Sequence, residues 1–109
     1  MIDRALIDNV YDELGKAYKA AHDAETEVTN AKRAYEQRKT QLLVAGVEGN
    51  NKEQRDAALE EGLINESRTL MLREESLAYA KLMLKLADLE RSRLRMIVEN
   101  EGNTHAHRT

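Results

Sequence analysis

Apolar residues recur along the first half of the chain at alternating steps of three and four. The series is Ile7, Val10, Leu14, Ala17, Ala21, Ala24, Val28, Ala31, Tyr35, Arg38, Leu42 and Ala45, in which Arg38 is the one charged member. This spacing keeps a stripe on one side of an α-helix and is typical of a coiled-coil seam. The pattern predicts one long helix over residues 3–45.

The second half carries a seam of the same kind. Its members are Leu59, Leu63, Glu66, Leu70, Arg73, Leu77, Ala80, Leu84, Ala87, Arg91, Leu94 and Val98. The pattern predicts a second helix over residues 51–101, in which Gly62 marks either a bend or a close contact. Large leucines on this helix would face small alanines on the first, and such complementarity favours close packing.

A short turn over residues 46–50 separates the two predicted helices. Gly46 suits the left-handed residue just after a helix end. Asn50 with Glu53, or Asn51 with Gln54, would form a capping box at the start of the second helix. Because so short a connection makes neighbouring helices antiparallel, we expect an all-α, antiparallel two-helix coiled-coil hairpin over residues 1–101.

The C-terminal end of the chain lacks an apolar pattern. Gly102 would end the second helix, and residues 102–109 have no apolar anchor, so we expect a disordered tail there.

Charged residues on the two helices are complementary. In the antiparallel pairing Glu25 falls opposite Arg73, and the acidic residues Asp8 and Asp12 face a basic tract. That tract consists of Arg91, Arg93 and Arg95. We interpret it first as the complement of the acidic N-terminus, with a nucleic-acid contact as the alternative.

The second helix also carries an apolar stripe that the hairpin cannot cover. This outer stripe consists of Leu72, Tyr79, Leu82, Leu86, Leu89 and Met96, and it is interrupted at Glu75 and Arg93. It lies roughly 200° around the helix from the seam, since each residue turns an α-helix by about 100°. The stripe predicts an intermolecular interface. We expect a homodimer forming a four-helix bundle, or alternatively a different protein docked on the same face.

Composition excludes several kinds of chemistry. The 109 residues include no Cys, so a disulfide framework, a thiolate zinc site and a Cys nucleophile are impossible. Charged residues make up 34% and aromatic residues 4%, which is typical of long solvated helices. With a net charge of -3, no strong positive field would hold DNA.

The remaining candidates for chemistry are weak. His22 lies beside the first seam, whereas His105 and His107 lie in the predicted tail, where two ligands do not make a metal site. The chain has no Glu-x-x-His motif and no phosphate-binding loop. A two-helix hairpin also offers no concave pocket. We therefore expect no enzymatic activity, cofactor, metal or small-molecule substrate. The absence of a signal-peptide pattern and of a long apolar run predicts a cytoplasmic protein without membrane contact.

The turn and the start of the second helix carry a resemblance. The run Gly46-Val-Glu-Gly49-Asn50-Asn51-Lys52-Glu53-Gln54-Arg55-Asp56-Ala57-Ala58-Leu59 resembles that of small phage and prophage proteins, which are cysteine-free helical hairpins. The resemblance implies a phage-encoded accessory protein that acts in the bacterial host cytoplasm by binding. We expect a non-enzymatic inhibitor or modulator of a host or antiviral-defence protein. The alternatives are a nucleic-acid-binding accessory of replication or recombination, and a structural spacer or scaffold.

Overall fold

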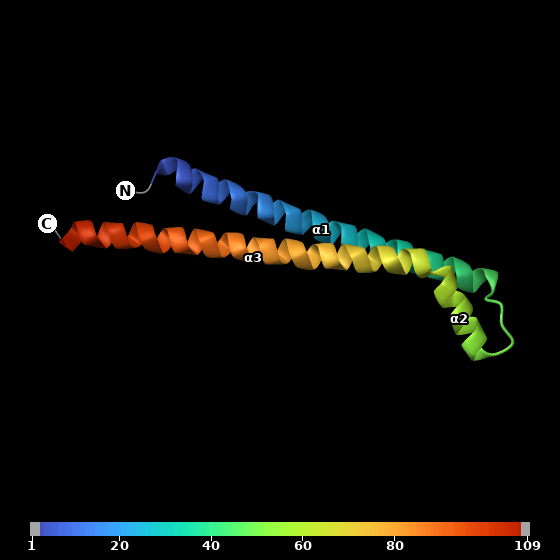
Figure 1. The fold of residues 1–109 in the computed structure, drawn as a ribbon. Helices are drawn as coiled ribbons and strands as arrows, with labels where there is room; N and C mark the ends of the chain where they lie inside the picture. Colours follow the sequence, from blue (N-terminus) through green and yellow to red (C-terminus); the bar gives the residue numbers. More distant parts are fainter. Residues whose placement is uncertain (1–2, 108–109) are drawn as a thin grey trace. The chain divides into compact units, whose positions relative to one another are not determined.

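The computed structural model describes residues 3–107, with side chains described for residues 3–102. Within this range the chain forms three helices and no strand: α1 (Arg4–Ala45), α2 (Lys52–Gly62) and α3 (Ile64–His107), as Figure 1 shows. The all-α, hairpin-like fold is confirmed. The chain divides into two compact units, a terminal unit of Met1–His22 with Tyr79–Thr109 and a hairpin unit of Asp23–Ala78.

Helix α1 begins and ends where the sequence predicts. The Asp3 carboxylate accepts a hydrogen bond from the Ala5 N–H at 3.1 Å, and the Asp3 carbonyl accepts one from the Leu6 N–H at 3.0 Å. Asp3 is therefore the N-cap of α1. At the other end Gly46 has φ +88°, which confirms the left-handed residue after Ala45.

Asn51 caps α2, which confirms the second of the two predicted capping boxes. The Gln54 N–H donates to Asn51 Oδ1 at 2.8 Å, and Gln54 Oε1 accepts from the Asn50 N–H at 2.8 Å. In the usual capping box the second bond returns to the N-cap residue itself. Here the second bond goes to Asn50, the residue before the N-cap, so it holds the end of the connection as well as the start of the helix.

The prediction of one continuous second helix is wrong, because the helix breaks at Leu63. This residue has φ -106° and ψ 4°, in the sparsely populated bridge region. Its N–H is shared between the carbonyls of Leu59 and Glu60, each at 3.1 Å. Figure 1 shows α2 turned away from the line of α3 at this point.

Gly62 explains why the chain breaks at this position. A Cβ atom on Gly62 would lie 2.8 Å from Leu42 Cδ1, so the missing side chain leaves room for Leu42 of α1. Glycine also weakens a helix interior by about 1 kcal/mol relative to alanine. The bend and the close contact, which the sequence left as alternatives, therefore occur together at Gly62.

Helix α3 continues past its predicted end. The helix runs to His107, so neither the stop at Gly102 nor a tail without structure from residue 102 is confirmed. In the described chain the glycines with positive φ are Gly46 and Gly49, so Gly102 keeps ordinary helical geometry. Nothing at Gly102 forces the helix to end, since the chain contains no proline. The rest of the predicted tail, residues 108–109 and the side chains from 103 onward, lies outside the described residues.

The core of the hairpin unit follows the predicted seams. Val28 and Ala31 of α1 are buried, and so is Leu63. The half-buried seam members are Ala24, Tyr35, Leu42, Leu59, Glu66, Leu70 and Leu77. The charged positions Arg38 and Arg73 are exposed, so the seam is not continuous there.

One ion pair connects α1 and α3 in the hairpin unit, but not the expected one. Arg73 Nε lies 3.7 Å from Glu27 Oε2, whereas the sequence placed Glu25 opposite Arg73. The prediction assumed an unbroken second helix, whereas that helix is broken at Leu63. Both side chains are about half exposed, so the pair orients the helices more than it stabilises them.

The terminal unit has a core of small and large residues in alternation. Leu14 and Ala21 of α1 and Ala80 and Leu94 of α3 are buried. The half-buried seam members are Ile7, Val10, Ala17, Leu84, Ala87 and Arg91. The two helical segments run in opposite directions (Figure 1), as the seam predicts. Val98 is the exception, because it is 44% exposed.

Two glycines test the local geometry by opposite effects. Gly49 has φ +152°, and a Cβ atom there would lie 2.8 Å from the Arg55 backbone nitrogen. We expect Gly49→Ala to lower the free energy of unfolding by about 1–3 kcal/mol. Gly15 lies inside α1 with no atom near its missing Cβ, so Gly15→Ala should raise stability by about 0.5–1 kcal/mol. Urea denaturation followed by circular dichroism measures the free energy of unfolding of both variants. A change of the same sign and size in the two variants would contradict the backbone geometry described at Gly49 and Gly15.

Candidate interaction surface

All six members of the outer stripe are exposed in the single chain. Five of them lie on the part of α3 that belongs to the terminal unit, and Leu72 lies on the part that belongs to the hairpin unit. The exposed fractions are 58% for Leu72, 64% for Tyr79, 51% for Leu82, 47% for Leu86, 58% for Leu89 and 64% for Met96. The seam with α1 therefore leaves these side chains uncovered, as the sequence predicts.

Helix geometry explains this exposure. Leu82 follows the buried seam residue Ala80 by two positions, and Leu86 follows the half-buried Leu84 by the same step. A step of two residues turns the helix by about 200°, so these leucines project on the side opposite to the seam. Isolated exposed leucines are ordinary in soluble proteins. A row of six large apolar side chains, interrupted at Glu75 and Arg93, is unusual, and such rows mark binding surfaces.

The end of α1 carries further apolar exposure that the sequence analysis did not single out as a surface. Val44 is 83% exposed and Leu43 is 55% exposed. Both belong to the apolar run Leu42 to Ala45. The 3–4 spacing assigns Leu42 and Ala45 of this run to the seam but neither Leu43 nor Val44, and that was the available signal that these two side chains point elsewhere.

The basic tract does not pair with α1 as predicted. Arg91 lies 3.0 Å from Asp88, and Arg95 lies 3.2 Å from Glu99, so both arginines pair with carboxylates of α3 itself. Carboxylates three or four residues away on the same helix are the nearest partners of a long cation. Arg93, the third member, is exposed. Because Asp88 and Glu99 offset two of the three charges, the tract offers less positive potential to nucleic acid than its sequence indicates.

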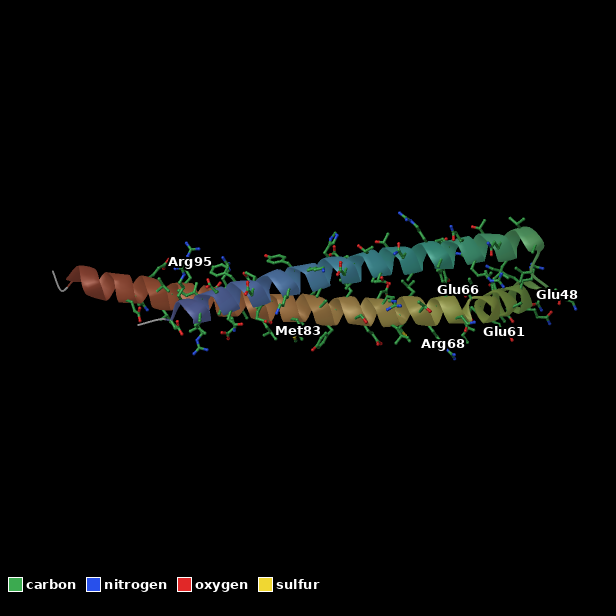
Figure 2. All side chains as sticks on the ribbon, turned by 90° about the horizontal axis from the view of Figure 1, so that it is seen from above. Glu48, Glu61, Glu66, Arg68, Met83 and Arg95 are labelled. Carbon is green, nitrogen blue, oxygen red and sulfur yellow. The ribbon has the colours of Figure 1, made fainter. Side chains whose placement is uncertain are left out.

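A groove in the hairpin unit was not predicted. It has a volume of about 530 Å³ and is lined by Tyr35, Ala57, Glu60, Glu61, Leu63, Ile64, Ser67 and Arg68. The groove exists because α2 and α3 meet at an angle at Leu63, whereas the sequence analysis expected two helices without the concave volume that an active site requires. Figure 2 shows Glu61 on α2 and Arg68 on α3, two of the charged residues that line it. The groove is open, and Leu63 is its one buried lining residue.

Metal chemistry finds no site in the part of the chain that the structure describes. No group of three or more His, Cys, Asp or Glu side chains is placed to hold a metal ion there. His22 is exposed on α1, and the side chains of His105 and His107 lie outside the described residues. Among the described helices, none has an apolar stretch long enough to cross a membrane.

Comparisons with models of protein families, with curated proteins and with solved structures found no match to this chain. The outer stripe, the groove and the basic tract are therefore interpreted from their own residues. Of the three, only the outer stripe consists of large apolar side chains that are all at least 47% exposed.

Proposed function

We propose that this chain is a non-enzymatic protein–protein interaction module that binds through the outer stripe of α3. The exposure of all six stripe residues is the observation that carries the proposal. Burying one large apolar side chain contributes about 1.5–3 kcal/mol, so a partner that covers several of them gains enough free energy for stable association. Helix α3 then presents the stripe on the face that its seam with α1 leaves uncovered.

The finer form of the proposal concerns the biological setting. The resemblance of the turn region to small phage and prophage proteins supports a phage-encoded protein that works in the host cytoplasm. In that setting the module would inhibit or modulate a host or antiviral-defence protein. The turn sequence from Gly46 to Leu59 supports this form, which is independent of the surface argument.

A double substitution in the stripe tests the surface argument. We expect Leu82→Glu with Leu86→Glu to abolish association, because two carboxylates would have to lose their water at the interface. Both positions are about half exposed in the single chain, so helicity should be retained. Sedimentation measures self-association, affinity capture measures binding of other proteins, and circular dichroism measures helicity.

A matched control separates the surface from added charge. Gln37→Glu with Gln41→Glu adds two carboxylates at the same spacing on exposed positions of α1. We expect this variant to associate like the wild type. If the stripe variant keeps every association of the wild-type chain, the interaction surface lies elsewhere and the proposal fails.

A further inference from the structure

We infer that the outer stripe is covered by a second copy of this chain, with the two α3 helices antiparallel and a two-fold axis at the level of Leu84. This inference rests on the proposed function, since it names the partner of the same surface. It is carried by a symmetry in the stripe itself, by the charges that interrupt the stripe and by the register of a 3–4 repeat.

The stripe is symmetric about Leu84. Leu82 and Leu86 lie at equal distances in sequence on either side of Leu84, and so do Tyr79 and Leu89. Along the continuous helix α3 the same relation holds for Leu72 and Met96. In an antiparallel pair centred at this level, every apolar stripe residue of one copy therefore meets an apolar residue of the other.

The two interruptions obey the same symmetry. Glu75 and Arg93 are equally far from Leu84, and both are exposed. The antiparallel pair places each Glu75 opposite Arg93 of the other copy, so two opposite-charge contacts form per dimer. Charged residues within an apolar seam fix register and orientation in coiled coils. A partner of unrelated sequence would give no reason for the two charges to be related in this way.

A parallel pair does not satisfy these charges. It would place Glu75 against Glu75 and Arg93 against Arg93, and like charges opposite each other destabilise a helix pair. The antiparallel pair also preserves the repeat, because alternating steps of three and four read the same in both directions about Leu84. An isologous two-fold contact of this kind is the commonest form of protein self-association.

One contact near the axis is unfavourable. Lys85 flanks the stripe and would lie close to Lys85 of the other copy. Lys85 is exposed, and a lysine can extend its ammonium group into water while its methylenes stay on the apolar surface. Salt screens the repulsion between the two Lys85 side chains. Added salt should therefore not dissociate this dimer, whereas it would dissociate a dimer held together by ion pairs alone.

A charge exchange tests the orientation. Glu75→Arg alone and Arg93→Glu alone each replace two attractive contacts per dimer by two repulsive ones. We expect each single variant to raise the dimer dissociation constant about tenfold or more, and the combined variant to restore it to within about threefold of the wild type. A combined variant as weak as the singles would overturn the proposed pairing. Sedimentation across a concentration series gives these constants.

Cross-linking tests the register with no background reaction, because the natural chain contains no cysteine. Leu72→Cys and Met96→Cys are prepared separately, one with a mass tag, and treated with a short bis-maleimide alone or after mixing. We expect a cross-linked dimer only in the mixture, and only between the two different variants. Cross-linking of each variant with itself would overturn the antiparallel arrangement.

The outcomes also separate this inference from the proposed function. A wild-type chain that is monomeric at all concentrations, together with cysteine variants that cross-link in no combination, overturns the second copy as the partner. The proposed function then stands if the Leu82 and Leu86 double variant loses capture of another protein that the wild type binds. The proposed function fails together with this inference if the wild type and the Leu82 and Leu86 double variant behave alike in both self-association and affinity capture.

Discussion

Replacing Leu14 with glutamate should open the terminal unit. Leu14 is 9% exposed in the seam between α1 and α3, so a carboxylate there would lose most of its water without a partner. We expect a loss of about 3–5 kcal/mol in the free energy of unfolding. That is a large part of the roughly 5–15 kcal/mol that stabilises a typical domain.

Hydrogen exchange measures where this loss occurs. We expect amides of residues 4–22 and 79–102 to lose protection first, because Leu14 belongs to the core of the terminal unit. Tyr18→Glu is the matched control, since it also replaces a large side chain by a carboxylate on α1 but at a position that is 56% exposed. A control that destabilises the chain as much as Leu14→Glu would show that added charge, and not seam packing, is responsible.

The seam could be predicted because it depends on periodicity alone. Leu14, Ala21, Val28 and Ala31 all fall on the 3–4 repeat, and all are buried. The outer stripe follows from the same geometry, since residues two positions after a seam residue must project on the opposite side of the helix. For this reason the exposure of the stripe could be predicted from the sequence without the tertiary contacts of α3.

Ion pairs and helix ends could not be predicted in this way, because they depend on local competition. Arg91 has a carboxylate three residues away at Asp88, and that contact occurs in place of the predicted one with α1. Gly102 resembles a helix end in sequence, yet glycine only lowers helix propensity and does not forbid a helix. In both cases the local interactions of the residue decide the outcome, and the heptad pattern along the chain does not report them.

The break at Leu63 shows a further limit of periodicity. Leu59, Leu63 and Leu70 continue the repeat across the break, so the pattern itself contains no interruption. The bend arises from the contact between Gly62 and Leu42, which are far apart in the sequence. The groove lined by Tyr35 and Arg68 depends on this bend. The sequence offered a bend at Gly62 as one of two alternatives, but it gave no indication of the groove.

Leu63 is the buried residue between α2 and α3, and its truncation should have the second large effect. It is 3% exposed, the lowest value among the buried residues of the described chain. We expect Leu63→Ala to lower the free energy of unfolding by about 2–5 kcal/mol, since the removed side chain leaves a cavity where α2 and α3 meet. Loss of amide protection should begin within residues 23–78, the hairpin unit.

Leu72→Ala provides the comparison for this effect. Leu72 is on the same helix but is 58% exposed, so its truncation should cost less than about 1 kcal/mol in the single chain. The comparison is made below the concentration at which the chain associates, because a partner on the outer stripe would bury Leu72 and increase its cost. Equal losses for the two variants under those conditions would mean that the burial of Leu63 does not stabilise the hairpin unit.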